Sequence, residues 1–437
     1  MSAQPSALAH GLADTVDWLW RDDPLRDPVV EQRARLLLLD CLGCALAALA
    51  KPPLARLADA LRAHERGTLA LPRIGGGLTT TQVAALLAMA ICWDEACEGL
   101  PRAHGRPGIH AVAPALALAL ARPVPLRALL GALVAGYEVG GRMGAVFRIK
   151  PGMHVDGTWG TFGAVAAAAR LRGLDTSATL DAISSVACQL PFSLYLPITE
   201  GHETRNTYLG HAASLALLAT AAAAAGIGAP AEAPAVHRHL ALGLEPDVAL
   251  VPTGQWLLLE GYLKAFAGTR HVHYGAACAL AWREAVGTPL PAIRAVTLEV
   301  YQEAQTYCAN RAPQSAIQAQ FSLSYGLARA LLNGSLEPDA YEPDALGDPA
   351  LQALEGMIEI AVDPAMATRG ARLTVVSEHG TWQGRSQDSP ADPERPMSPA
   401  EVAAKFRRYA APALGARAAG LAELVLRAPL ETCFVVG

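Results

Sequence analysis

The sequence predicts a mainly α-helical protein: a large all-helical domain with a smaller inserted α+β domain. Three observations predict this fold class. Of the 437 residues, 52% are apolar and 17% are charged, which indicates extensive burial rather than disorder. Aromatic residues make up only 5%, so alanine, leucine and valine build the core, and alanine and leucine favour helices. Strand-like alternation is confined to a region that begins near residue 287.

From residue 30 to about 280 the chain shows one helical pattern after another. "VVEQRARLLLLDCLGCALAALA" (29–50) spaces its apolar positions as a helix does. "TTTQVAALLAMAICW" (79–93) begins with threonines that can cap a helix. Later segments are apolar on nearly all sides and are separated by Gly and Pro. We therefore expect helices that are buried among other helices.

The strand-like region has the two-residue period of a sheet. "GMIEIAVDP" (356–364) and "GARLTVVSEHGTWQGRSQ" (370–387) predict strands, with a turn at His379 and Gly380 in the second segment. A further strand is predicted where apolar residues alternate at Val296, Leu298 and Val300.

Helical patterns also occur within and after this region. "QAQFSLSYGLARALLNG" (318–334) predicts a helix that ends at Asn-Gly, and 399–415 predicts an amphipathic helix. We therefore expect a helical domain over 1–280, an α+β domain over 281–397 and a return to the helical domain over 398–437.

Composition and charge exclude several classes of protein. The net charge is −5 and there are no basic runs, so nucleic-acid binding is not expected. The first twenty residues lack the basic start and apolar run of a secretory signal. The strongest membrane candidate, 212–231, is rich in weakly hydrophobic alanine and ends in Gly and Pro, so we expect a core helix and no membrane span.

The eight cysteines are scattered and lie mostly in apolar, helix-like segments. Cys41 and Cys44 belong to one apolar helical segment, so they predict core side chains rather than a metal or redox pair. Cys92 and Cys97 have no matching third cysteine, which makes an iron–sulfur cluster a poor fit. This usage is typical of a protein of the reducing cytoplasm.

Seven of the twelve histidines lie in four short polar islands, and this clustering indicates a site. The first island, "WDEACEGLPRAHGRPGIH" (93–110), is a charged loop between apolar helices; it reads either as part of a site or as a solvated connection. In the second, His154 lies in a Gly-rich turn before a Gly/Ala helix, without a phosphate-binding fingerprint.

The third island, "TEGHETRNTYLGH" (199–211), places Arg205 at a helix N-terminus. A cation is unfavourable there unless it meets an anion, so its partner is either a carboxylate ligand or an internal acid, for which Glu200 and Glu203 are the candidates.

The fourth island, "YLKAFAGTRHVHYGAACAL" (262–280), carries Lys264, Arg270, His271 and His273. On an extended segment the two histidines face the same way, as metal ligands can. No third ligand is marked by spacing, so we expect a cationic, proton-transferring cluster and no metal.

Together the islands predict a pocket for a small acid with two or three carboxylates, because several cations lie in them with few acids. Histidine, lysine and tyrosine in such a pocket suit the removal of a proton next to a carboxylate, where the developing enolate needs positive charge nearby.

In this order the islands resemble the MmgE/PrpD family, which includes 2-methylcitrate dehydratase, cis-aconitate decarboxylase and iminodisuccinate epimerase. The resemblance runs from about residue 30 to 415 and implies a homodimer whose α+β domain is a lid. It implies a cofactor-free active site between the helical domain and that lid. The matching segments are "LLLLDCLGCALA", "AALLAMAICWDEACEG", "GRPGIHAVAPALALA", "LVAGYEVGGRMG", "HVDGTWGTFGAVAAAARLRGLD", "RNTYLGHAASLALLA", "LKAFAGTRHVHYGAACAL", "FSLSYGLARALLNG" and "AEVAAKFRRYAAPALG".

Residue by residue, the resemblance places the family's catalytic histidine on His154, its lysine on Lys264 and its lid tyrosine on Tyr325. The "CRHTH"-like stretch of relatives corresponds to 269–273, which contains Arg270 and His273.

The chain also departs from the family pattern. Where many relatives have "D-x-D-D-T", this chain has Cys92 and Ala96 at the ends, while Asp94 and Glu95 remain. Arg106 stands where relatives often have the histidine of "HPG", and His104 lies two residues earlier. Arg205 replaces a lysine, which predicts a carboxylate clamp rather than a base.

The leading hypothesis is a cofactor-independent lyase, a dehydratase of a small di- or tricarboxylic hydroxy acid. The alternatives are an epimerase or decarboxylase of the iminodisuccinate or cis-aconitate type, and a non-catalytic carboxylate-binding homologue. The expected catalytic residues are His104, His154, Lys264 and Tyr325, without an assignment of acid and base. The expected substrate-binding residues are Asp94, Arg106, Arg205, Arg270 and His273.

Overall fold

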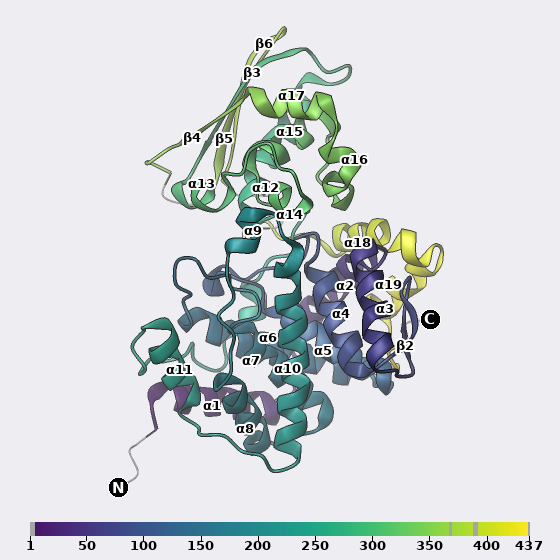
Figure 1. Ribbon diagram of the computed structural model, residues 1–437, viewed down its shortest axis with the longest axis vertical. Coiled ribbons are helices and arrows are strands. Elements are labelled where there is room, and N and C mark those ends of the chain that lie inside the picture. The colour runs from purple at the N-terminus through teal and green to yellow at the C-terminus, as the bar shows by residue number, and fades with distance from the viewer. Residues whose placement is uncertain (1–4, 367–368, 388–391, 436–437) are drawn as a thin grey trace.

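The computed structural model describes residues 5–366, 369–387 and 392–435. The protein is mainly α-helical, as predicted, and 60% of the structure is helical. Its long axis runs from a helical body to an α+β portion, which forms the upper end of Figure 1. The C-terminal helices, drawn in yellow, pack beside α2 (Pro28–Ala48) of the body.

The helical body contains α1 (Ala7–Arg21), η1 (Pro24–Arg26), α2 (Pro28–Ala48), α3 (Pro52–His64), α4 (Thr80–Cys92), η2 (Pro101–Ala103), α5 (Pro107–Ala121), α6 (Leu126–Val146), α7 (Gly160–Arg172), α8 (Thr176–Ala187), α9 (Leu196–Glu200), η3 (Glu203–Asn206), α10 (Thr207–Ala224), α11 (Ala233–Leu242), η4 (Leu257–Glu260), α18 (Pro399–Leu414) and α19 (Arg417–Arg427). A small antiparallel hairpin, β1 (Leu69–Leu71) and β2 (Gly75–Leu78), lies between α3 and α4.

Local sequence signals set the helix ends. Thr79 caps α4 as predicted: its side chain accepts a hydrogen bond from the Gln82 backbone N–H at 3.3 Å, and the Gln82 side chain accepts one from the Thr79 N–H at 3.0 Å. Ser398 and Glu401 form the same reciprocal cap at the start of α18. Both caps satisfy backbone donors that the first helical turn leaves free.

Glycine allows α6 and α7 to cross closely beneath the site. A Cβ added to Gly163 would lie 2.4 Å from the carbonyl oxygen of Gly136, and one added to Gly136 would lie 2.7 Å from the Gly163 oxygen. The two backbones therefore touch, which places the N-terminus of α7 against the middle of α6. A methyl group at either position would force the helices apart.

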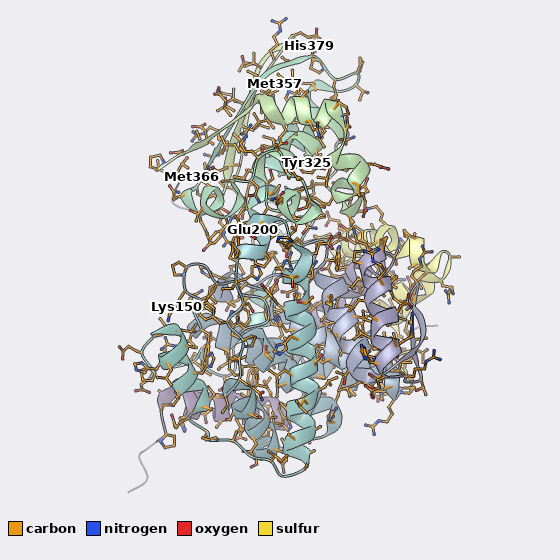
Figure 2. The ribbon with its side chains drawn as sticks, viewed as in Figure 1. Lys150, Glu200, Tyr325, Met357, Met366 and His379 are labelled. Atoms are coloured by element: carbon orange, nitrogen blue, oxygen red, sulfur yellow. The ribbon has the colours of Figure 1, made fainter. Side chains whose placement is uncertain are left out.

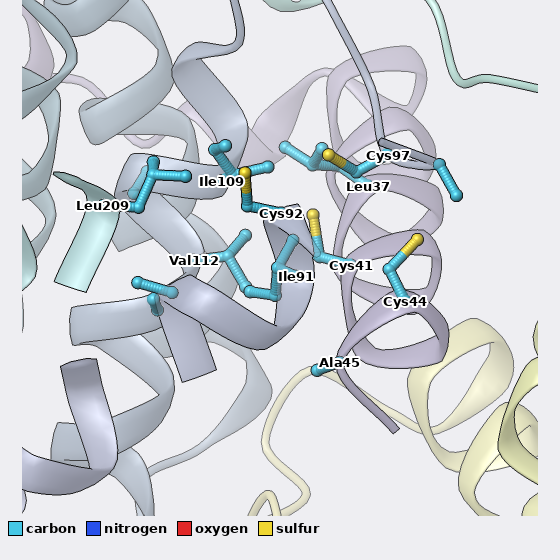
Figure 3. Close-up of a cluster of buried hydrophobic side chains, with 14 of the residues drawn as sticks. Leu37, Cys41, Cys44, Ala45, Ile91, Cys92, Cys97, Ile109, Val112 and Leu209 are labelled. Atoms are coloured by element: carbon cyan, nitrogen blue, oxygen red, sulfur yellow. The ribbon is translucent and has the colours of Figure 1, made fainter. Parts of the chain in front are cut away.

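Four of the cysteines are buried in the apolar core of the helical body. Figure 3 shows Cys41 and Cys44 of α2 in one cluster of buried apolar side chains with Cys92, Cys97 and Leu37. All four are buried and free of disulfides. Burial raises the pKa of the Cys41 and Cys44 thiols well above their usual range, so they are unreactive core side chains.

One helix of the described residues, Glu203–Ala224, is long and apolar enough to pass a test for a membrane span, with a mean hydropathy of 1.2. It packs against α4, α7 and α8, and 56% of its most apolar 18-residue stretch is buried inside the protein. This is the packing of a core helix, as predicted for this part of the chain.

The α+β portion contains α12 (Arg270–Val286), β3 (Ile293–Val300), α13 (Gln302–Cys308), α14 (Ala316–Gln320), α15 (Leu323–Asn333), η5 (Pro338–Tyr341), α16 (Pro343–Leu346), α17 (Pro349–Met357), β4 (Ile358–Val362), β5 (Ala371–Ser377) and β6 (Gly380–Ser386). The strand order is β4-β3-β5-β6; β3 and β4 are parallel, and the other neighbours are antiparallel.

The predicted strand pattern is confirmed in β3, where Val296, Leu298 and Val300 are all buried. The predicted turn is also present, because β5 ends at Ser377 and β6 begins at Gly380, whose φ of +110° suits glycine.

Two features differ from the sequence prediction. Helix α12 packs on β5, β6 and α15, so a segment assigned to the helical domain up to residue 280 lies with the sheet. The segment that contains His271 and His273 is the first turn of that helix, not an extended stretch. Residues two apart in a helix point to different sides, so these two histidines do not face the same way.

The chain returns to the body through α18, which packs on α2. Buried Lys405 on α18 donates to the Asp40 carboxylate of α2 at 2.6 Å. It also donates to the backbone carbonyls of Ala96 and Lys264, at 2.5 and 2.9 Å. Helix α18 thus supports two loops that belong to the site described next.

Candidate active site

A cavity of about 280 Å³ lies where the helical body meets the α+β portion. The body contributes the loop before α5, the turn before α7 and the segment before α12. The α+β portion contributes the start of α12, α13 and residue 369. The polar lining residues are Glu95, His104, Arg106, Arg148, His154, Lys264, Thr269, Arg270, His271, Glu303 and Arg369, and the aromatic ones are Phe147, Trp159, Tyr195, Tyr262, Tyr307 and Phe321.

The structure brings five of the nine predicted site residues to this cavity: His104, Arg106, His154, Lys264 and Arg270. They come from three segments that are far apart in the sequence, so three of the four polar islands converge here.

Glu95 forms the centre of a buried ion network beneath the cavity. It follows α4 in a left-handed turn with a φ of 52°, which aims its carboxylate at three cations. The carboxylate lies 2.9 Å from Arg106 Nη1, 2.7 Å from Arg205 Nη1 and 3.0 Å from Lys264 Nζ. Burial alone would raise the pKa of Glu95, but Arg106, Lys264 and Arg205 hold it well below its usual range.

Asp156 is the second acid of this network. It pairs with Arg106, and it lies 3.3 Å from Arg205 Nη1. Burial opposes its ionisation, but Arg106, His154 and Arg205 together lower the pKa of Asp156 to about 2. Two ionised acids therefore hold three buried cations, which are Arg106, Arg205 and Lys264, and the cluster keeps one net positive charge.

The predicted partners of Arg205 are wrong. Its guanidinium is fully buried and pairs with Glu95 and Asp156 rather than with Glu200 or Glu203. Arg205 does not line the cavity, so it faces an internal acid and is not placed to clamp a ligand. This pairing depends on how three loops from distant parts of the chain come together in the folded protein.

Asp94 and His273 lie outside the cavity, although both were expected to bind substrate. Asp94 is buried and pairs with Lys51 Nζ at 2.9 Å. The His273 ring donates from Nε2 to the Gly268 carbonyl at 3.1 Å and packs edge-on against Phe266. It thus stabilises the turn that precedes α12.

Tyr325 also lies away from the cavity. Its hydroxyl is buried and donates to the backbone carbonyl of Ala340. Figure 2 shows Tyr325 among the helices of the α+β portion, above the junction where Glu200 lies. A separate hollow of about 230 Å³ borders it there. The structure thus gives Tyr325 a packing role in α15 rather than a place at the pocket.

Arg270 is held against the cavity wall by aromatic rings. Its guanidinium lies 3.8 Å from the centroid of the Tyr262 ring, and its Nε donates to the Tyr274 hydroxyl at 3.3 Å. It also pairs with Asp392. Arg369, which the sequence analysis did not identify, pairs with Glu303 at 3.5 Å on the same side of the cavity.

The hydrogen bonding of His154 fixes the tautomer of its ring at the cavity. Its Nδ1 accepts a hydrogen bond from the Asp156 backbone N–H at 3.0 Å, so the neutral ring carries its proton on Nε2. Burial is the main cause that lowers the pKa of His154 to about 4, and the Arg205 and Arg106 charges add to it. The side chain is therefore neutral near pH 7 and offers Nε2–H as a donor.

The two histidines of the first island differ in role. His110 donates from Nδ1 to the Arg106 carbonyl at 2.9 Å and accepts at Nε2 from the Gly157 N–H at 3.3 Å, so both nitrogens are used in the fold. His104 sits at the exposed rim with a φ of 51°. Burial and the nearby cations Arg148 and Arg369 lower its pKa.

The sequence does not predict Glu95, His271 or Arg369 individually as site residues. Glu95 and His271 lie inside two of the predicted polar islands. The clustering of polar residues therefore indicates their segments, but it does not distinguish these two side chains from their neighbours. Arg369, Glu303 and Tyr307 lie in the α+β portion outside any island, and no pattern marks them.

One group of described side chains has the geometry of metal ligands: Cys92 Sγ, Glu95 and Asp156 oxygens all lie within 4.8 Å of one another. The donor set does not fit a cation. Arg106 and Arg205 already occupy both carboxylates, and burial raises the pKa of the Cys92 thiol to about 12, so it stays protonated near pH 7.

Comparison with known proteins agrees with this architecture. The model of the MmgE/PrpD N-terminal domain matches residues 12–240, and that of the MmgE/PrpD C-terminal domain matches residues 266–428. No curated protein matches the chain. The family includes hydro-lyases such as 2-methylcitrate dehydratase, which supports a lyase-like function at the level of the family. Since the two matches cover nearly the whole chain, this protein belongs to the MmgE/PrpD family.

Proposed function

We propose that this protein is a cofactor-independent lyase that removes water from a small di- or tricarboxylic hydroxy acid. The observation that carries the proposal is the charge of the cavity wall. Five cationic side chains and two acids line it among the described residues; the cations are Arg106, Arg148, Lys264, Arg270 and Arg369, and the acids are Glu95 and Glu303. Such a wall favours a polyanion of small volume.

The reaction begins with loss of a proton from the carbon next to a carboxylate. The C–H electron pair moves toward that carboxylate as an enolate, then forms a C=C bond as the neighbouring C–O bond breaks. The proton and the hydroxyl leave the substrate in separate steps, and together they account for the water that is released. Lys264 and the arginines of the wall stabilise the negative charge of the enolate. These cations are already fixed in a site shielded from water, so they need not reorient as the charge develops.

His154 contributes a hydrogen bond from Nε2 to the departing hydroxyl or to a carboxylate. A neutral imidazole of this tautomer is a donor and not a base, since its only other nitrogen is occupied by a backbone N–H. Arg106 pairs with the buried acids Glu95 and Asp156, and the other arginines among the described lining residues are Arg148, Arg270 and Arg369.

The α+β portion acts as a lid in this proposal. Tyr195 of the body donates from its hydroxyl to the backbone carbonyl of Tyr307 on α13 at 2.9 Å, and the two rings pack 5.7 Å apart. Opening of this contact would separate the two halves of the cavity wall and admit the substrate. We also propose that the enzyme is a cytoplasmic homodimer.

A panel of hydroxy acids tests the reaction. Malate, citrate, 2-methylcitrate and tartrate are incubated with the enzyme, and the unsaturated product is followed by ultraviolet absorbance. We expect one acid to give product, and His154→Gln to lower its turnover. Deuterium uptake from D₂O without net conversion would instead identify an epimerase, and release of CO₂ would identify a decarboxylase.

A second candidate is a non-catalytic carboxylate-binding homologue. The observation that favours it is the internal ion network, because Arg106 and Arg205 are already neutralised by Glu95 and Asp156. Calorimetric binding of one acid of the panel, with neither turnover nor deuterium uptake, would support this candidate over the lyase.

A further inference from the structure

His271 occupies the wall of the cavity that belongs to the α+β portion. It is the second residue of α12, and its ring stacks on Tyr307 with an interplanar angle of 19° and a centroid distance of 6.0 Å. Nδ1 is hydrogen-bonded to the hydroxyl of Tyr301, which lies between β3 and α13. His271 lines the cavity and Tyr301 does not. The edge of the ring that carries Nε2 is therefore the one left toward the cavity.

The partner of Nδ1 decides which proton arrangement each histidine can adopt. The backbone N–H that faces Nδ1 of His154 can only donate, so the neutral His154 ring must carry its proton on Nε2. The Tyr301 hydroxyl that faces Nδ1 of His271 can accept, so the neutral His271 ring can carry its proton on Nδ1. His271 can then leave a lone pair on Nε2.

The charges around His271 favour this second arrangement. Arg369, Lys264 and Arg270 lie near enough to lower the pKa of His271, and His104 acts in the same direction. With burial as the main cause, the pKa falls to about 3, so the ring is neutral near pH 7. A lone pair on Nε2 is attracted to these cations, whereas an N–H dipole there would be repelled.

We propose that His271 is the base that removes the proton next to the substrate carboxylate, with Nδ1 bonded to Tyr301 and Nε2 facing the substrate. The inference rests on the proposed lyase function and assigns a role that the function alone leaves open. In the step the C–H bond breaks, an N–H bond forms at Nε2, and the electron pair stays on the substrate as an enolate. His154 lines the same cavity, and its Nε2–H is the donor in the proposed reaction.

The protonation of His271 can be measured without turnover. Full-length protein is labelled with ¹⁵N-histidine, and His271 and His154 signals are assigned with the variants His271→Gln and His154→Gln. At pH 7 we expect an unprotonated, pyridine-type Nε2 in His271 and a protonated, pyrrole-type Nε2 in His154. Succinate, as a dicarboxylate probe, should shift both signals. A protonated Nε2 in His271 would overturn the inference.

Kinetics provide the second measurement, with the acid that the panel identifies. General base catalysis contributes about 10²- to 10⁴-fold, so His271→Gln should lower kcat by that factor and stop deuterium uptake from D₂O. Succinate should still bind, with Kd changed less than about threefold, because the cations remain; a threefold change is only about 0.7 kcal/mol. Tyr301→Phe should lower kcat less and alter the pH profile, because Nδ1 loses its partner.

The matched control is His379→Gln, since His379 lies at the far tip of the sheet between β5 and β6 (Figure 2). It should leave kcat and Kd unchanged. An active wild type with an unimpaired His271→Gln variant would overturn this inference alone. A wild type that neither converts nor exchanges any acid would overturn the lyase function and the inference with it.

Discussion

The ion network makes a strong prediction for the substitution Glu95→Gln. The Glu95 side chain is 5% exposed, and its carboxylate contacts Arg106, Arg205 and Lys264 at 2.7 to 3.0 Å. The amide of glutamine keeps the shape but removes the charge, so only Asp156 remains to balance three buried cations. An uncompensated buried charge costs about 3–5 kcal/mol of unfolding free energy.

The expected change in melting temperature follows from the length of the chain. The unfolding entropy is about 2.1 cal/mol/K per residue, or roughly 0.9 kcal/mol/K for 437 residues, so Tm should fall by ~3–5 °C. The assay is thermal unfolding followed by circular dichroism, with urea unfolding as a second measure of the free energy.

Glu260→Gln is the matched control. Glu260 pairs with Arg102 at 2.7 Å, but its side chain is 37% exposed and that of Arg102 is 44% exposed. Surface pairs contribute about 0–1 kcal/mol, so this variant should melt within about 1 °C of the wild type. If Glu95→Gln proves as stable as Glu260→Gln, the network does not hold the site together as argued.

Three further predictions concern the core. Burial raises the pKa of Glu98 to about 8, far above its unfolded value, so its stabilisation is complete at acid pH and is lost as the pH rises toward 8. From pH 5 to pH 8 the unfolding free energy of Glu98→Gln should therefore rise relative to that of the wild type, by up to ~1.4 kcal/mol per pH unit. If the two proteins differ in unfolding free energy by the same amount at both pH values, the prediction is wrong. Tyr325→Phe should leave ligand affinity and turnover unchanged and cost about 1–3 kcal/mol of stability, because the Ala340 carbonyl loses its donor; reduced turnover in a folded variant would restore the role expected from the resemblance. Lys405→Met should cost about 3–5 kcal/mol in urea unfolding, because Asp40 would stay buried without its cation; a loss below about 1 kcal/mol would show that Asp40 takes up a proton without cost.

Much of the fold could be predicted because its signals are local. Threonine at position 79, the alternation of Val296, Leu298 and Val300, and the turn at Gly380 each act within a few residues, and each is present in the structure. The alanine- and leucine-rich composition determined the mainly helical class in the same way, since helix propensity and burial depend on residue type.

The site could be predicted only as a set of segments. Charge and histidine clustering marked the islands that supply Arg106, His154 and Lys264 to the cavity. The individual pairings depend on how loops from distant parts of the chain approach one another, and the sequence holds no local signal for that. The partners of Arg205 illustrate this, because Glu95 and Asp156 lie 110 and 49 positions away from it.

The fourth island shows where the sequence by itself stops. Its composition determined that a cationic, histidine-containing segment belongs to the site, and that much needs no tertiary structure. Whether His271 or His273 meets the cavity depends on the segment being helical, because a helix turns residues two apart to different sides. Packing of α12 on the sheet decided that His271 faces the cavity while His273 supports the backbone at Gly268.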